Sequence, residues 1–177
     1  MIKKGLGFAA LCFVMGFTPV YGREGTAQAN AVLMNAQGER VGSATFSAVP
    51  DGVQVSVEVE GLTAGPHGFH IHEAGLCEPP DFKTAGAHFN PHEKKHGLQN
   101  PEGAHLGDLP NLLVGDDGKG KGKALIQGAS FGDGPNSLLQ FGGTSVVIHA
   151  AADDEMTDPA GNAGARVVCG VIVSESE

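Results

Sequence analysis

The chain has 177 residues and carries 20 acidic against 11 basic side chains, for a formal net charge of −9. This acidic balance excludes a general nucleic-acid binder, which would present a basic face. Glycine (28 residues) and proline (10) are abundant, Trp is absent, and 41% of the residues are hydrophobic. The composition therefore predicts one loop-rich, globular β domain with a largely aliphatic core.

Residues 1–22 have the pattern of a secretory signal peptide. Lys3 and Lys4 precede a short apolar run that ends at Phe17, and small residues follow it. The run is too short to span a bilayer comfortably. We expect cleavage at the end of this segment and a mature domain of residues 23–177. That domain would be periplasmic or secreted, with no membrane attachment and no nucleic-acid partner; an uncleaved anchor is the alternative.

The three cysteines are divided between the predicted signal peptide and the mature domain. Cys12 lies in the predicted signal peptide, which leaves Cys77 and Cys169 in the mature chain. An oxidising compartment favours a disulfide between them. Such a bridge would close a long loop and contribute roughly 4 kcal/mol in the chain-entropy model. Two buried thiols are the alternative.

Alternating apolar and polar residues predict a series of short strands. In the clearest case, valine occupies every second position of residues 53–59, so one face is buried and the other is wet. A turn at Pro50-Asp51-Gly52 joins this strand to a preceding one over residues 41–49. The other strands are expected at residues 31–36, 69–72, 106–114, 124–126, 145–148 and 166–173. Eight short strands with turns indicate an all-β antiparallel sandwich or barrel.

Two long stretches have no periodicity, residues 73–104 and residues 150–165. Structureless loops of this length inside a compact domain are usually functional. Lysines at 119, 121 and 123 alternate with glycine, which is typical of a solvated hairpin.

The histidines are concentrated in one region, since seven of the eight lie between His67 and His105. His70 and His72 are two residues apart on a predicted strand, so both side chains leave the same face, with Cα atoms roughly 7 Å apart. They could converge on one metal through different ring nitrogens. Three further histidines and a carboxylate in or beside the first loop suit a closed tetrahedral zinc site: His88, His96, His105 and Asp108.

Four motifs in a fixed order carry a resemblance to a known family. They are GFHIH at residues 68–72, GAHFNP at 86–91, HLGD at 105–108 and GNAGARVVCG at 161–170. Over about residues 30–174 the chain resembles the Cu,Zn superoxide dismutases. The run GDLPNL at residues 107–112 and the signal peptide resemble the bacterial, periplasmic branch. The resemblance implies an eight-stranded antiparallel Greek-key barrel with two long functional loops.

The resemblance also implies one copper ion and one Zn²⁺ per chain. The implied copper ligands are His70, His72, His88 and His149. The implied zinc ligands are His88, His96, His105 and Asp108, so that His88 bridges the two ions as an imidazolate. Asp153 would link His70 to His96, Cys77 and Cys169 would form the family disulfide, and Arg166 would stand beside the open copper position. His88 and Arg166 are the implied catalytic residues.

The implied activity is the dismutation of superoxide to oxygen and hydrogen peroxide, with copper alternating between Cu(II) and Cu(I) and zinc structural. His67 is expected to be structural and His92 to be a solvated loop residue. The alternative is a catalytically silent copper/zinc carrier or metal-binding module of the same fold. The chain has all four copper-type histidines and no Cys-x-x-Cys motif, which favours the enzyme. Monomer and homodimer both stay open.

The substrate is an anion, and residues 150–165, which match the family's electrostatic loop, hold no lysine but four acidic residues. Screening acts over roughly 8–10 Å at physiological salt, so only charges near the site count. We expect Lys83, between Cys77 and His88, to supply part of the positive field beside Arg166.

Overall fold

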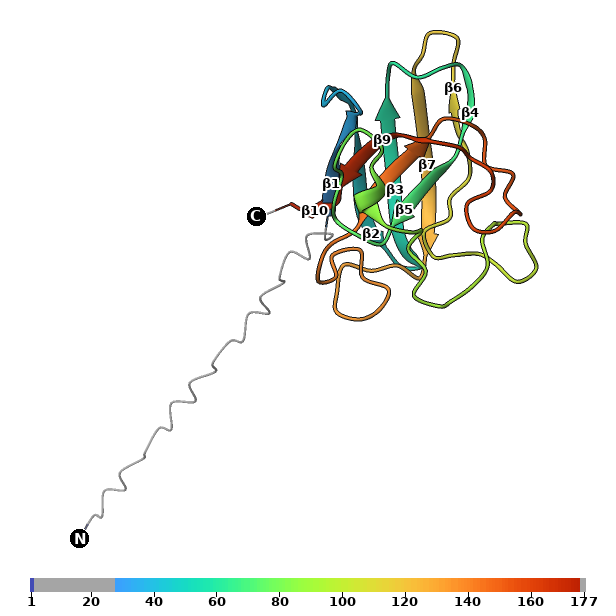
Figure 1. The fold of residues 1–177 in the computed structure, drawn as a ribbon. Coiled ribbons are helices and arrows are strands. Elements are labelled where there is room, and N and C mark those ends of the chain that lie inside the picture. Colours follow the sequence, from blue (N-terminus) through green and yellow to red (C-terminus); the bar gives the residue numbers. More distant parts are fainter. Residues whose placement is uncertain (2–27, 176–177) are drawn as a thin grey trace.

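The structure, a computed structural model, describes residues 28–175 together with Met1 (Figure 1). Apart from Met1, the predicted signal peptide with its Cys12 lies outside these residues. In the part of the chain that the structure describes, no helix has the length and hydropathy needed to cross a membrane.

The described residues are all-β, with ten strands and one short 3₁₀ segment, η1 (Lys83–Ala85). The strands are β1 (Gln28–Asn35), β2 (Arg40–Val49), β3 (Gly52–Val59), β4 (Gly65–His67), β5 (Phe69–His72), β6 (Leu112–Val114), β7 (Gly120–Gln127), β8 (Ser145–His149), β9 (Arg166–Val171) and β10 (Val173–Ser174).

The strands form one antiparallel sheet in the order β4-β6-β7-β3-β2-β1-β9-β8-β5, and β10 pairs with β1. The two strands at the ends of this order, β4 and β5, are consecutive in the chain and separated by Gly68 alone. The sheet therefore curls into a nearly closed barrel (Figure 1). The predicted antiparallel barrel is confirmed, with ten strands in place of eight because β4 was not expected and the last predicted strand is split.

Strand β3 follows the predicted alternation. The turn at residues 50–52 places Val49 opposite Gly52 in the β2–β3 hairpin. Val53, Val55 and Val57 are fully buried and belong to the main core, which fills the barrel interior. The period-two pattern thus predicts both the strand and its buried face.

The strand predicted over residues 106–114 is wrong for most of its length, because only Leu112–Val114 is extended. The Asp108 N–H donates to the His105 carbonyl at 3.2 Å, which makes a turn there, and Pro110 has no N–H to give to a ladder. Strand β7 is longer than predicted, because it pairs with the whole of β3, from Gly52 opposite Gln127 to Val59 opposite Gly120.

The two irregular stretches lie on the same side of the barrel, as the green-to-yellow and red segments of Figure 1 show. They are tied together by two main-chain donors. The Gln99 N–H donates to the Glu155 carbonyl at 3.0 Å, and the His96 N–H donates to the Asp158 carboxylate at 2.8 Å. The two loops thereby cover the face of β5 that carries His70 and His72, since Asp153 contacts His70 and His88 pairs with His72.

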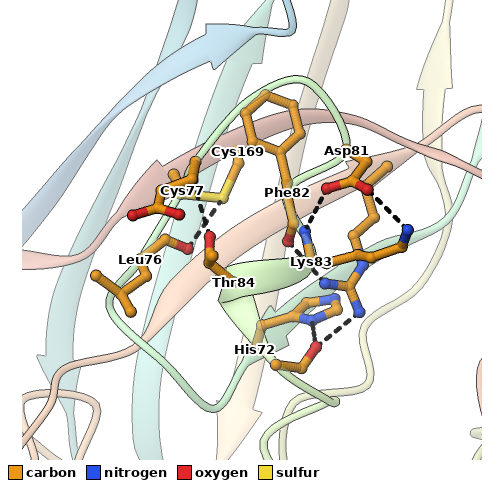
Figure 2. Close-up of a disulfide and its surroundings, with 11 residues drawn as sticks. His72, Leu76, Cys77, Asp81, Phe82, Lys83, Thr84 and Cys169 are labelled. Carbon is orange, nitrogen blue, oxygen red and sulfur yellow. Dashed lines mark hydrogen bonds and ion pairs between the residues drawn. A yellow bond between two sulfur atoms is a disulfide. The ribbon is translucent and has the colours of Figure 1, made fainter.

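Cys77 and Cys169 form a disulfide with Cα atoms 5.6 Å apart (Figure 2). This confirms the predicted bridge and excludes two free thiols. The bond fastens the first long loop to β9, next to a small buried cluster that includes Phe82, Ala85 and Val147.

Candidate metal centre

Two strands and one loop bring four buried histidines together. His70 and His72 are buried on the face of β5 opposite to the core residues Phe69 and Ile71, and His88 reaches them from the first loop through an isolated bridge with His72. His149 ends β8, after a register shift between Ile148 and His149. Such irregularities re-aim side chains next to functional sites. One ring nitrogen from each of the four histidines lies within 4.8 Å of the others.

Each of these four rings has one nitrogen that is occupied and one that is not. One nitrogen of His70 contacts the Asp153 carboxylate, and one of His88 contacts the Asp108 carboxylate. One nitrogen of His72 contacts the Gly86 carbonyl, and one of His149 contacts the Gly164 carbonyl. The other nitrogens are buried without a partner among the described residues: His70 Nδ1, His72 Nε2, His88 Nε2 and His149 Nε2. Buried polar atoms are rarely left unpaired, and each such atom costs roughly 1–3 kcal/mol. Four of them converging on one point fit a bound cation, and four imidazoles suit Cu(II).

A second group is built around Asp108. Its Oδ1 lies 2.8 Å from His88 Nδ1, 3.1 Å from His96 Nδ1 and 3.2 Å from His105 Nδ1. The His88 and His105 nitrogens are 3.5 Å apart. In a tetrahedral site with bonds of about 2.0 Å, neighbouring ligand atoms are about 3.3 Å apart. The observed separations therefore fit a zinc ion at the centre of three nitrogens and one carboxylate oxygen.

His88 belongs to both groups. Its Nδ1 faces the Asp108 group and its Nε2 faces the histidine group. A single ring with its two nitrogens in two adjoining sites can bridge two cations. This is the arrangement that the resemblance implied for His88.

Asp153 links one histidine of each group through its two carboxylate oxygens. Its Oδ2 lies 2.6 Å from His70 Nε2, and its Oδ1 lies 3.0 Å from His96 Nε2. A carboxylate on the far nitrogen of a ligand ring fixes the tautomer and the orientation of that ring. The structure thus brings Asp153 to the place that the resemblance gave it.

Sequence reasoning missed two residues that hold Asp153. The Asn111 side chain donates to the Asp153 carbonyl and accepts from its N–H, both at 2.8 Å. Gly161 has φ 58° and packs against the same carboxylate so closely that a Cβ would overlap it and come within 2.8 Å of His96 Nε2. Their motifs were noted, but no local pattern indicates that Asn111 and Gly161 meet Asp153.

The protein keeps most of these groups in the state that binds metal. Burial lowers the pKa of His72 to about 2, that of His149 to about 3 and that of His88 to about 4. These imidazoles are therefore neutral at pH 7, with a lone pair available. For Asp108, burial opposes ionisation, but hydrogen bonds from His105, His88 and His96 outweigh it and hold its pKa well below the usual range.

His96 behaves differently. Burial lowers its pKa, but hydrogen bonds to Asp108 and Asp153 outweigh this and raise the pKa to about 9. The two carboxylates thus favour a positive charge at this position. A proton or a metal ion can supply that charge.

The two other histidines agree with the prediction. His67 is buried, with Nδ1 2.7 Å from the His149 carbonyl and Nε2 2.8 Å from the Thr63 carbonyl. It therefore ties the loop before β4 to the end of β8. His92 is exposed in the first loop.

Arg166, at the start of β9, is held by the loop that the disulfide fastens. Its guanidinium donates to the Phe82 carbonyl at 2.7 Å and to the Gly86 carbonyl at 2.6 Å. Burial lowers its pKa, but a guanidinium keeps its charge at neutral pH. Lys83 is exposed, and its ammonium lies 2.8 Å from the Asp81 carboxylate, as Figure 2 shows. Sequence reasoning did not anticipate this pairing.

The fold and these groups define a class of protein, a small antiparallel β-barrel with two adjoining metal sites that share one imidazole. The comparisons with known proteins agree with this class. A family model described as copper/zinc superoxide dismutase matches residues 40–172, so the chain belongs to the copper/zinc superoxide dismutase family. The family is one of oxidoreductases that use copper and zinc, and superoxide is its substrate.

Three relatives illustrate the similarity. The chain is 47% identical over 147 residues to "Superoxide dismutase [Cu-Zn] 2" of Aquifex aeolicus, covering 82% of this chain and 86% of the relative. It is 37% identical over 162 residues to an extracellular superoxide dismutase [Cu-Zn] of Brugia pahangi, covering 83% and 76%. Among solved structures, a SOD-like protein from Bacillus subtilis matches with a TM-score of 0.78 and 40% identity, covering 81% of this chain and 97% of that one.

Proposed function

We propose that this chain converts superoxide to oxygen and hydrogen peroxide at a copper ion held by His70, His72, His88 and His149. The observation that carries the proposal is the set of four buried ring nitrogens without a partner, all within 4.8 Å of one another. When bound, copper supplies one-electron chemistry by alternating between Cu(II) and Cu(I).

The side chains of this chain do the rest. Arg166 offers its guanidinium to the anionic substrate. The Phe82 and Gly86 carbonyls of the first long loop fix the position of this guanidinium. His88 Nε2 can accept a proton, because this nitrogen is buried without a partner among the described residues while Nδ1 lies 2.8 Å from Asp108 Oδ1. Its other nitrogen stays on the Asp108 side, so the ring keeps its place while Nε2 changes state.

The proposed zinc ligands are His88, His96, His105 and Asp108. The Asp108 Oδ2 also accepts from the Gly97 and His105 N–H groups, both at 2.9 Å. The carboxylate that would bind zinc therefore also orders the polypeptide around it. We assign zinc a structural role, in which it stabilises a loop that has few apolar residues.

We also propose a location outside the cytoplasm, with residues 1–22 removed as a signal peptide and the mature domain periplasmic or secreted. The Cys77–Cys169 disulfide supports it, since such bonds persist in oxidising compartments. The extracellular relative named above supports it as well. Sedimentation of the mature protein would distinguish the monomer from the homodimer, which the sequence leaves as alternatives.

The test of the proposed function combines metal analysis with turnover. The mature protein, reconstituted with copper and zinc, is expected to bind one of each and to remove superoxide in a pulse-radiolysis assay. His149→Gln should lose turnover and keep the fold, whereas His92→Gln, at an exposed loop position, should match the parent. One copper and one zinc per chain with no turnover would favour the carrier of the same fold.

A further inference from the structure

A surface depression of about 400 Å³ opens beside Arg166, between the disulfide loop and the end of the second long loop. It is lined by Pro80, Asp81, Lys83, Gly164, Ala165 and Arg166. The Gly164 carbonyl lies 3.1 Å from His149 Nδ1, so the depression borders the histidine group. An anion that approaches Arg166 through this depression passes the other charged side chains that line it.

Those charges are two cations and one carboxylate. The Lys83 ammonium lies 2.8 Å from Asp81 Oδ2, and the two side chains are 83% and 53% exposed. An ion pair this exposed contributes little to folding stability. The charges of Lys83 and Asp81 still act on a small ion in the depression, because both side chains line it and screening at physiological salt acts only over about 8 Å.

We propose that Asp81 restrains the capture of anionic substrate: its carboxylate offsets Lys83 and weakens the field that draws superoxide towards Arg166. Asp81 acts on the field and touches neither metal ligands nor the reacting atoms. Its charge also reaches Arg166, where it opposes the lowering of the guanidinium pKa by burial. Lys83 therefore attracts anions less strongly than an unpaired lysine would.

The inference rests on the proposed function, because it takes Arg166 to face the substrate. The test uses Asp81→Asn in the copper- and zinc-loaded protein. The asparagine keeps an oxygen where Asp81 Oδ1 accepts from the Lys83 N–H at 3.2 Å, so the local turn is retained. With one unit of negative charge removed, we expect kcat/KM to rise about twofold at low salt. The difference should disappear at about 1 M salt, where the Debye length is about 3 Å.

Matched variants separate the local charge from the total charge. Lys83→Gln should lower kcat/KM by a similar factor, and the double variant should return close to the parent. Asp116→Asn removes the same charge from an exposed position in the β6–β7 turn and should leave kcat/KM unchanged. A second readout is the affinity for azide, an inert anion, by spectroscopic titration. It should tighten about twofold in Asp81→Asn and not in Asp116→Asn.

An Asp81→Asn variant with the parent's salt dependence and azide affinity would overturn the role of Asp81, and so would a gain that Asp116→Asn shares. Either result would leave the proposed function intact, since the parent would still turn over superoxide. Absence of turnover in the loaded parent would instead overturn the proposed function, and the azide titration would still test Asp81.

Discussion

Arg166 and His72 donate hydrogen bonds to the same acceptor, the carbonyl oxygen of Gly86, at 2.6 and 3.0 Å. Because His72 donates through Nδ1, its Nε2 is left with a lone pair that points into the histidine group. One peptide group therefore sets both the position of the Arg166 guanidinium, which we propose faces the substrate, and the orientation of a proposed copper ligand. Gly86 has φ 77°, a backbone conformation that suits glycine.

Replacement of Arg166 should separate its charge from its geometry. Arg166→Lys keeps the charge but cannot reach both carbonyls with a planar fork. We expect kcat/KM to fall several-fold in Arg166→Lys and by about tenfold or more in Arg166→Gln, which loses the charge as well. Copper and zinc contents should stay at the parent values. Equal activity in the two variants would contradict a role for the charge.

Removal of the Asp108 carboxylate should release zinc and loosen the first long loop. Loss of an outer hydrogen-bond partner of a ligand typically costs 10–100-fold in metal affinity, and loss of a ligand should cost more. We therefore expect Asp108→Asn to bind zinc more than about 100-fold more weakly and to melt several degrees lower in saturating zinc. Asp133→Asn, at an exposed loop position, is the control. A melting profile of Asp108→Asn that still responds to zinc like the parent would count against this site.

A methyl group at Gly161 should disturb the centre by displacing the Asp153 carboxylate and crowding the His96 ring. An alanine Cβ there would overlap the Asp153 carboxylate, which would have to leave His70 and His96. We expect Gly161→Ala to weaken metal binding by roughly 10–100-fold, as measured by competition with a chelator. Gly38→Ala is a matched control, because Gly38 also has a positive φ, 77°, and nothing lies within 4 Å of a Cβ at that position. If both variants bound metal equally well, the close packing of Gly161 against Asp153 would not contribute to metal affinity.

Acid should destabilise the chelator-treated protein. The pKa values of His72, His149 and His88 are lowered to about 2, 3 and 4, against about 6.5 in an unfolded chain. Between about pH 6.5 and pH 4 the unfolded chain therefore binds protons that the folded chain does not, so the free energy of unfolding falls as the pH falls.

His96 contributes with the opposite sign. Its pKa is raised to about 9, so its stabilisation is full below about pH 6.5 and is lost as the pH rises through 9. Urea unfolding from pH 4 to pH 10 should consequently show a maximum near neutrality, with the steeper loss on the acid side. His92→Gln should leave this profile unchanged. A free energy of unfolding that rises steadily to pH 9 would contradict the predicted contribution of His96.

The residues that sequence reasoning placed correctly are those whose information is local. Period-two alternation predicts β3 and its buried valines, and it places His70 and His72 on one face of β5. The resemblance that the motif GAHFNP helps to carry implies that His88 belongs to both groups, and the structure brings it to both. The even number of cysteines after residue 22 predicts the Cys77–Cys169 bond.

Tertiary structure decided what depends on contacts between distant segments. Asn111 and Asp153 are 42 positions apart, and no local pattern could indicate that they hold each other. The turn at residues 105–108 replaces part of a predicted strand, because a carboxylate and three imidazoles meet there. The free nitrogen of each ring is set by the carbonyl or carboxylate that occupies the other nitrogen. Residue type and spacing thus determined which chemistry the chain can perform, whereas the closing of the barrel and the stacking of the two loops determined where each donor atom points.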